Sequence, residues 1–240
     1  MAIVSNTVNY LDGDTLLEAF FAYDEAIEGR RPAVLINHAW GGRDEFVANK
    51  AIKLAELGYV GFALDMYGKG ILGSGPEENA KLMQPFMDDR AMLQKRINAA
   101  LAAVKLLPWV DDQKCAAIGF CFGGLCVLDL ARTGADIKGV VSFHGLLGAP
   151  GNTEGTQIKA KVLALHGHDD PMAPPEQVLA FEREMTRAGA DWQVDVYGNT
   201  MHAFTNPIAN NPGFGTVYQA DADRRSWIAM KSFLEEIFLT

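Results

Sequence analysis

Apolar and polar positions follow two alternating patterns along nearly the whole chain. Short apolar runs of the kind found in buried strands are followed by stretches with apolar residues at helical spacing. The apolar runs predict strands at residues 8–10, 16–23, 33–37, 59–64, 114–119, 137–143, 160–165 and 192–197. The helical spacing predicts helices at residues 46–57, 86–107, 123–131, 175–187 and 222–238. The first two strands form a hairpin around residues 11–14.

Repeated strand–helix units predict an α/β fold with a mostly parallel sheet that is covered by helices on both faces. We expect right-handed connections between its strands. No internal repeat or linker divides the chain, so residues 1–240 are expected to form a single domain. Two segments, 67–84 and 202–220, are predicted to be irregular. Ligands of such sheets bind beyond the carboxyl ends of the strands, where loops of this kind lie.

Composition narrows the class of protein without identifying it. The 240 residues are 49% hydrophobic and 21% charged, which is usual for a soluble globular protein. A net charge of −9 argues against nucleic acid as a partner. No apolar run approaches the roughly 18 residues of a membrane span, and no signal peptide is expected. The odd cysteine count, with all three between residues 115 and 126, does not fit a disulfide framework and favours the cytoplasm.

The junction between the strand at 114–119 and the helix at 123–131 carries the most informative motif. It reads Gly119-Phe-Cys121-Phe-Gly123-Gly124. Gly-x-nucleophile-x-Gly at a strand–helix turn is typical of the nucleophile elbow of α/β hydrolases, here with Cys in place of Ser. The turn is strained, so the residues two positions away on either side must be small. The helix N-terminus also favours a thiolate. The alternative is that Cys121 is a small core residue.

A nucleophilic Cys121 needs a general base and a group that orients the base. In this fold the chain order is nucleophile, acid, histidine. Asp170 follows the strand at 160–165, and His202 follows the strand at 192–197. We therefore predict a catalytic triad of Cys121, Asp170 and His202. Asp169 is adjacent to Asp170, and the position directly before Pro171 favours Asp170 for this role.

The same architecture predicts donors for an oxyanion. One is the backbone N–H of Phe122, the residue after the nucleophile, and the other comes from the loop after the strand at 33–37, where we choose Ala39. Attack by a thiolate on an ester carbonyl gives a thioester, which water activated by His202 then hydrolyses. Esters, lactones and thioesters are the substrates that suit this chemistry.

Three motifs together resemble the dienelactone hydrolase family: the cysteine elbow at 119–124, the strand end at 167–170 and the turn at 202–204. The resemblance covers nearly the whole chain. It implies an α/β-hydrolase fold and a cytoplasmic enzyme that needs no cofactor and opens a lactone ring with a Cys–His–Asp triad.

The chain departs from that family at two positions. His38 stands where the resemblance implies a Glu that shares the proton of the resting thiol, and Asn206 stands where it implies an Arg that binds the substrate carboxylate. The resemblance also implies a second such Arg near residues 72–90, where no residue aligns with it and Arg90 is a weak candidate. We therefore predict a neutral ester substrate, with activated phosphate triesters as an extension. The predicted pocket residues are His38, Trp40, Tyr67, Phe143, His144, Phe204 and Asn206.

Two other functions stay open at this point. His166, His168, Asp169 and Asp170 form a sequence of the kind that binds metal in hydrolases, although no second ligand cluster accompanies it. A non-catalytic binding protein on the same fold is the second alternative. For the thiol hydrolase and for the metal-dependent hydrolase alike, the expected partner is a small-molecule substrate, with no nucleic acid or membrane. The chain is expected to be a monomer or a weak homodimer.

Overall fold

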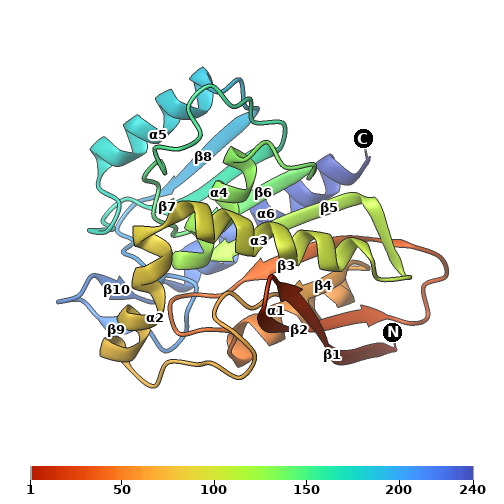
Figure 1. The fold of residues 1–240 in the computed structure, drawn as a ribbon. Coiled ribbons are helices and arrows are strands. Elements are labelled where there is room, and N and C mark those ends of the chain that lie inside the picture. The colour runs from red at the N-terminus through yellow and green to blue at the C-terminus, as the bar shows by residue number, and fades with distance from the viewer. Residues whose placement is uncertain (1, 240) are drawn as a thin grey trace. The chain divides into compact units, whose positions relative to one another are not determined.

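The computed structural model describes residues 2–239. It contains two compact units, Met1–Ile118 (unit 1) and Gly119–Thr240 (unit 2), and in each of them strands are flanked by helices (Figure 1). The expectation of a single domain over residues 1–240 stays a prediction.

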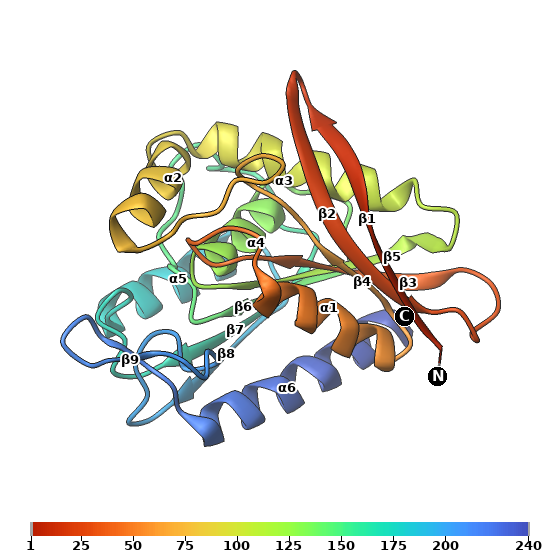
Figure 2. The ribbon, with the colours of Figure 1, turned by 90° about the horizontal axis from the view of Figure 1, so that it is seen from below.

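Unit 1 begins with the predicted hairpin, formed by β1 (Ile3–Asp12) and β2 (Thr15–Asp24). The strand order continues through β4 (Val60–Ala63) and β3 (Arg31–Asn37) to β5 (Val110–Phe120), whose end lies in unit 2. β2 pairs with β4 in antiparallel fashion, and β3 pairs with β4 in parallel. Helix α1 (Glu45–Glu56) packs on β2 and β4, and α3 (Arg90–Lys105) packs on β1 and β3 from the other side (Figure 2).

Helix α1 begins and ends where its sequence predicts. The side chain of Asp44 caps its first turn by accepting a hydrogen bond from the Val47 N–H at 3.3 Å. The helix ends at Leu57, and Gly58 follows with φ of 90°, the left-handed conformation that glycine adopts most easily.

The prediction of one helix over 86–107 after an irregular segment to residue 84 is wrong. Helix α2 spans Pro76–Asp88, and α3 starts anew at Arg90. Pro76 opens α2 at a position where its missing N–H costs nothing, and α2 then continues through Pro85. Asp89 ends it, because its backbone is extended and its side chain caps α3 by accepting from the Met92 N–H at 2.9 Å.

Unit 2 contains the three parallel strands β6 (Gly139–Phe143), β7 (Lys161–Gly167) and β8 (Trp192–Tyr197), paired in that order. Helices α4 (Phe122–Arg132) and α6 (Ala220–Leu239) pack against β6 and lie on opposite faces of these strands (Figure 2). Every residue of α4 is buried. Helix α5 (Pro175–Arg187) connects β7 to β8. The predicted α/β layering with parallel strands is therefore confirmed in this unit.

The segment after β8 is irregular, as predicted, apart from a short antiparallel pair formed by β9 (Asn210–Asn211) and β10 (Thr216–Val217). Across residues 2–239, no helix combines the length and the apolar character that crossing a bilayer requires.

Candidate active site

Cys121 occupies a sharp turn between the end of β5 and the start of α4. Its backbone has φ of 56° and ψ of −117°, a strained combination for a residue with a side chain. The carbonyl of Cys121 accepts hydrogen bonds from the N–H groups of Gly124 and Leu125, which start the helix. Its side chain is half-buried. The thiol thus stands at the N-terminal end of a helix, where the helix dipole favours negative charge.

The glycines around Cys121 are required by close backbone approaches. A Cβ at Gly119 would lie 2.0 Å from the carbonyl oxygen of Gly123, so that no side chain fits there. A Cβ at Gly124 would lie 2.6 Å from Oγ of Ser142 and 2.7 Å from Cα of Gly145. These distances confirm the predicted need for a small residue at position 119 and show that position 124 must also be small for α4 to pack against the strands.

Asp170 and His202 form a buried pair on loops that follow β7 and β8. Nδ1 of His202 lies 2.7 Å from Oδ2 of Asp170, and the two side chains are 2% and 0% exposed. The second carboxylate oxygen of Asp170 accepts a hydrogen bond from the Met172 N–H at 2.8 Å, which fixes its orientation. Asp169 is exposed. Of the two adjacent aspartates, it is therefore Asp170 that orients the imidazole.

The electrostatics of His202 favour the protonated form of its imidazole. Burial alone would lower the pKa of His202, but the charge of Cys121 and the hydrogen bond with Asp170 outweigh it and raise this pKa to about 10. Nε2 is buried and no hydrogen bond of normal geometry satisfies it, although the Cys121 sulfur is near enough for its charge to act. The structure therefore brings the three predicted triad residues into one interacting group.

Glycines also allow the loops of Asp170 and His202 to approach each other closely. A Cβ at Gly167 would lie 2.4 Å from the carbonyl oxygen of Thr200, and one at Gly215 would lie 2.2 Å from Cγ of Pro171. The carbonyl of Gly215 also accepts a hydrogen bond from the His202 N–H at 2.9 Å. Sequence analysis missed Gly215, since a lone glycine in a loop rich in Asn and Pro carries no signal of its own.

Four of the predicted pocket residues lie in unit 2. Phe143 and Phe204 are 1% and 0% exposed; Phe143 stacks on Phe120, and Phe204 meets the ring of His144 edge to face. Asn206 is half-buried, and its side-chain oxygen accepts from the Ile208 N–H at 3.2 Å. Their contact with a substrate stays a prediction.

The other predicted residues lie in unit 1. His38 has no exposed surface; its Nδ1–H donates to the carbonyl of Ala39 at 2.6 Å, and Nε2 accepts from the Met66 N–H at 3.2 Å. Burial lowers the pKa of His38, and an Nε2 that accepts a hydrogen bond carries no proton, which makes the ring neutral. Its two nitrogens thus link its own loop to the backbone of Met66. Tyr67 is buried and donates to the carbonyl of the half-buried Trp40 at 2.9 Å.

The sequence His166-x-His168-Asp169-Asp170 does not gather a ligand set. Among residues 2–239, no three or more His, Cys, Asp or Glu side chains are placed to hold a metal ion. His166 is buried with Nδ1 unpaired, His168 and Asp169 are exposed, and Asp170 is committed to His202. The metal-dependent alternative therefore has no support in the described residues.

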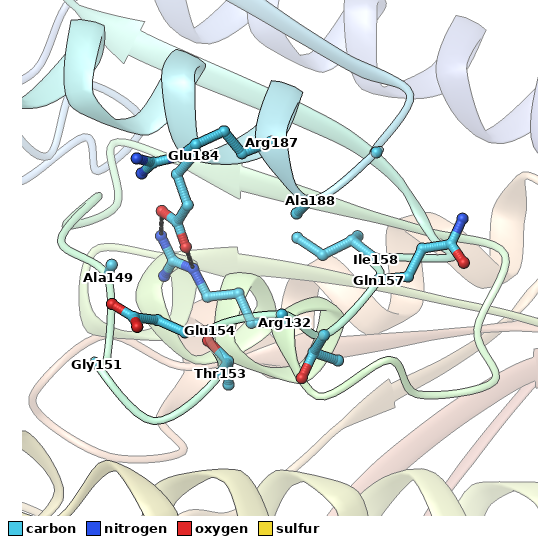
Figure 3. Close-up of a pocket in the computed structure, with 13 residues that line it drawn as sticks. Arg132, Ala149, Gly151, Thr153, Glu154, Gln157, Ile158, Glu184, Arg187 and Ala188 are labelled. Carbon is cyan, nitrogen blue, oxygen red and sulfur yellow. Dashed lines mark hydrogen bonds and ion pairs between the residues drawn. The ribbon is translucent and has the colours of Figure 1, made fainter.

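A cavity of about 630 Å³ in unit 2 contains none of the triad residues among its lining. Figure 3 shows the loop around Thr153 and Glu154 on one side and the end of α5 on the other. Arg132 lies in its wall and binds both carboxylate oxygens of Glu184, at 2.8 and 2.7 Å. The hydrogen bonds of this pair stabilise the junction of α4 and α5 and involve no group of the triad.

Comparison with known proteins identifies the family of this chain. A family model for the dienelactone hydrolase family matches residues 17–238. A putative carboxymethylenebutenolidase of Aquifex aeolicus is 31% identical over 73% of this chain and 77% of its own length. A probable 2-oxo-3-(5-oxofuran-2-ylidene)propanoate lactonase of Bradyrhizobium sp. is 27% identical over 95% of this chain and 93% of its own.

A solved structure of a dienelactone hydrolase-like protein has the same fold as this chain. The dienelactone hydrolase-like promiscuous phosphotriesterase P91, from metagenomic libraries, has 38% identity and a TM-score of 0.92 over 99% of both chains. The fold is thus that of the α/β hydrolases, and this chain belongs to the dienelactone hydrolase family.

Proposed function

We propose that this ester-bond hydrolase works through a Cys121–His202–Asp170 triad and a thioester intermediate. The observation that supports this most strongly is the buried His202–Asp170 pair at 2.7 Å, together with the Cys121 charge that holds the proton on His202. A nucleophile, a base and a group that orients the base are then present in one place.

In the first half of the reaction, the Cys121 thiolate attacks the carbonyl carbon and the carbonyl oxygen becomes an oxyanion. The Phe122 N–H, in the first turn of α4, is the donor that we assign to this oxyanion. When the tetrahedral intermediate collapses, the C–O bond breaks and the leaving alkoxide takes the proton of His202. Ala39, which belongs to unit 1, stays the predicted second donor.

In the second half, His202 is neutral and removes a proton from water. The resulting hydroxide adds to the thioester carbonyl, the C–S bond breaks, and the acid product leaves with the thiolate and the imidazolium restored. Asp170 holds the imidazole in the tautomer with the proton on Nδ1 and stabilises the imidazolium as it forms, as in the serine triads.

We propose neutral esters and lactones as the substrates. Asn206, without charge, occupies the position where the family resemblance implies an arginine for a substrate carboxylate, and the chain carries a net charge of −9. One relative is named as a lactonase and one similar structure as a promiscuous phosphotriesterase, which supports lactones and neutral phosphate triesters as further substrates. None of the three cysteines forms a disulfide, which supports a reducing compartment, the cytoplasm.

The test is hydrolysis of p-nitrophenyl acetate and butyrate by the wild type and Cys121→Ala, with and without EDTA. We expect activity that survives the chelator and is lost in the variant. Cys115→Ala, which removes a buried thiol elsewhere, is the matched control and should retain activity. Activity that persists in Cys121→Ala, or disappears with EDTA alone, would refute the thiol mechanism.

Substrate charge is tested separately by measuring kcat/KM for paired p-nitrophenyl esters with and without a carboxylate on the acyl group. The neutral ester should be the better substrate. A strong preference for the anionic ester would exclude the proposed substrate class while leaving the triad intact.

A further inference from the structure

His144 lies directly after β6, in a conformation that side chains rarely adopt. Its φ is 38°, its side chain is 3% exposed, and its N–H donates to the carbonyl of Leu165 at 2.8 Å. A strained backbone at a non-glycine residue persists only where the surrounding contacts determine it. The contacts of the His144 side chain should therefore show what keeps its backbone in this conformation.

Both ring nitrogens of His144 are engaged, each with a different part of the site. The backbone N–H of Cys121, which also donates to the carbonyl of Phe143, donates to Nδ1 at 3.1 Å. Nε2 lies 2.7 Å from Oγ1 of Thr205. Since a backbone N–H can only donate, Nδ1 carries no proton. The neutral ring then carries its proton on Nε2 and donates it to Thr205.

The ring of His144 also meets the predicted general base. Its centroid lies 5.1 Å from that of His202, with the planes at 65°, so the edge of one ring faces the other. Thr205 and His202 belong to the same loop after β8, three positions apart in the sequence. His144 thus contacts the nucleophile elbow through one nitrogen and the loop of the base through the other.

We propose that His144 is a positioning residue that holds the Cys121 elbow and the His202 loop in register through the Cys121–His144–Thr205 bridge. This inference rests on the proposed function of Cys121 and His202. The bridge keeps the sulfur and the imidazole at the separation that proton transfer needs, and displacements of about 1 Å in such a site can cost on the order of 100-fold in rate. Substrate binding depends on it much less.

Three substitutions separate the two halves of the bridge. His144→Asn keeps an acceptor near the Nδ1 position and tolerates the left-handed backbone, but cannot reach Thr205. His144→Gln places its amide near the Nε2 position and leaves the Cys121 N–H without its imidazole acceptor. Thr205→Val removes only the hydroxyl. Thr133→Val, which removes a hydroxyl bonded to the Leu130 carbonyl at the far end of α4, is the control.

We measure kcat and KM for p-nitrophenyl acetate, the rate of Cys121 alkylation by iodoacetamide, and the melting temperature of each variant. Each His144 variant should lose about 10- to 100-fold in kcat, with KM within about twofold of the wild type. Thr205→Val should lose less than either and should add nothing to His144→Asn in the double variant, because both remove the same link. Alkylation of Cys121 should change in the His144 variants and stay unchanged in Thr133→Val.

The inference would be overturned if folded His144→Asn, His144→Gln and Thr205→Val all kept kcat and alkylation rate within about twofold of the wild type. It would equally be overturned if the effects of His144→Asn and Thr205→Val were additive. If a His144 variant does not fold, the near-isosteric Thr205→Val decides alone. If the proposed function itself were wrong, the result would be different: ester hydrolysis would be unaffected by Cys121→Ala.

Discussion

Replacing Asp170 by Asn tests the buried pair that supports the proposed mechanism. The substitution keeps the shape of the side chain and removes its charge, and an amide N–H facing Nδ1 favours the wrong tautomer of His202. The two side chains are 2% and 0% exposed, and breaking such a buried pair costs about 3–5 kcal/mol. At 1.36 kcal/mol per factor of ten, the step in which the imidazolium forms slows roughly 10²- to 10⁴-fold.

That step is hydrolysis of the thioester, because His202 gains its proton from water there. Asp170→Asn should therefore release p-nitrophenol in a rapid burst of about one equivalent and then turn over slowly. Stopped-flow measurement of p-nitrophenyl acetate hydrolysis at pH 7 checks this, with the exposed neighbour in Asp169→Asn as a control that should lie within about twofold of the wild type. A folded Asp170→Asn variant with steady-state kcat within about threefold of the wild type would refute the reasoning.

Three further outcomes are expected from the structure. Gly215→Ala places a Cβ 2.2 Å from Cγ of Pro171 at φ of 78°, so it should cost at least about 1–2 kcal/mol and lower both the melting temperature and kcat. Glu184→Ala removes two hydrogen bonds from the guanidinium of Arg132, which is 1% exposed; urea unfolding should show a loss of about 1.5–3 kcal/mol, and an unchanged midpoint would contradict this. The pKa of His202 is raised from 6.5 to about 10, so its charge stabilises the folded state fully below pH 6.5, and this contribution is lost as pH rises through 10. The stability difference between the wild type and a His202→Gln variant should therefore shrink from pH 6.5 to pH 10, and growth over that range would count against the imidazolium.

The elbow could be predicted because its steric demands appear in the sequence as glycines at fixed distances from Cys121. The same holds for the neighbourhood of Asp170 and His202. Apolar runs mark the strands, and parallel strands end at one edge of a sheet, so the residues that follow two such runs can meet. The order of nucleophile, acid and histidine then limited the choice to one histidine and two adjacent aspartates.

Other features depended on contacts that local patterns do not encode. The break at Asp89 is set by a capping side chain within an otherwise helical stretch. Helix α2 passes through Pro85, although proline usually interrupts a helix. The two partners of His38 come from its own loop and from Met66, more than twenty residues away. Nothing in the sequence distinguishes Thr205, which matters only because the loop after β8 brings it to His144.

The complete burial of α4 limits the positions at which substitutions can change the substrate specificity of this protein. A helix that is packed on all sides leaves no position at which variation is free, since even a change of one methylene is felt in a close-packed interior. Random mutagenesis of Phe122–Arg132 would therefore return mostly unfolded protein. Exposed positions in the loop between β8 and α6, such as Ile208 and Phe214, can change at little cost to stability. When specificity evolves, in nature or in the laboratory, substitutions should therefore accumulate at these exposed positions while the helix that follows Cys121 stays almost constant.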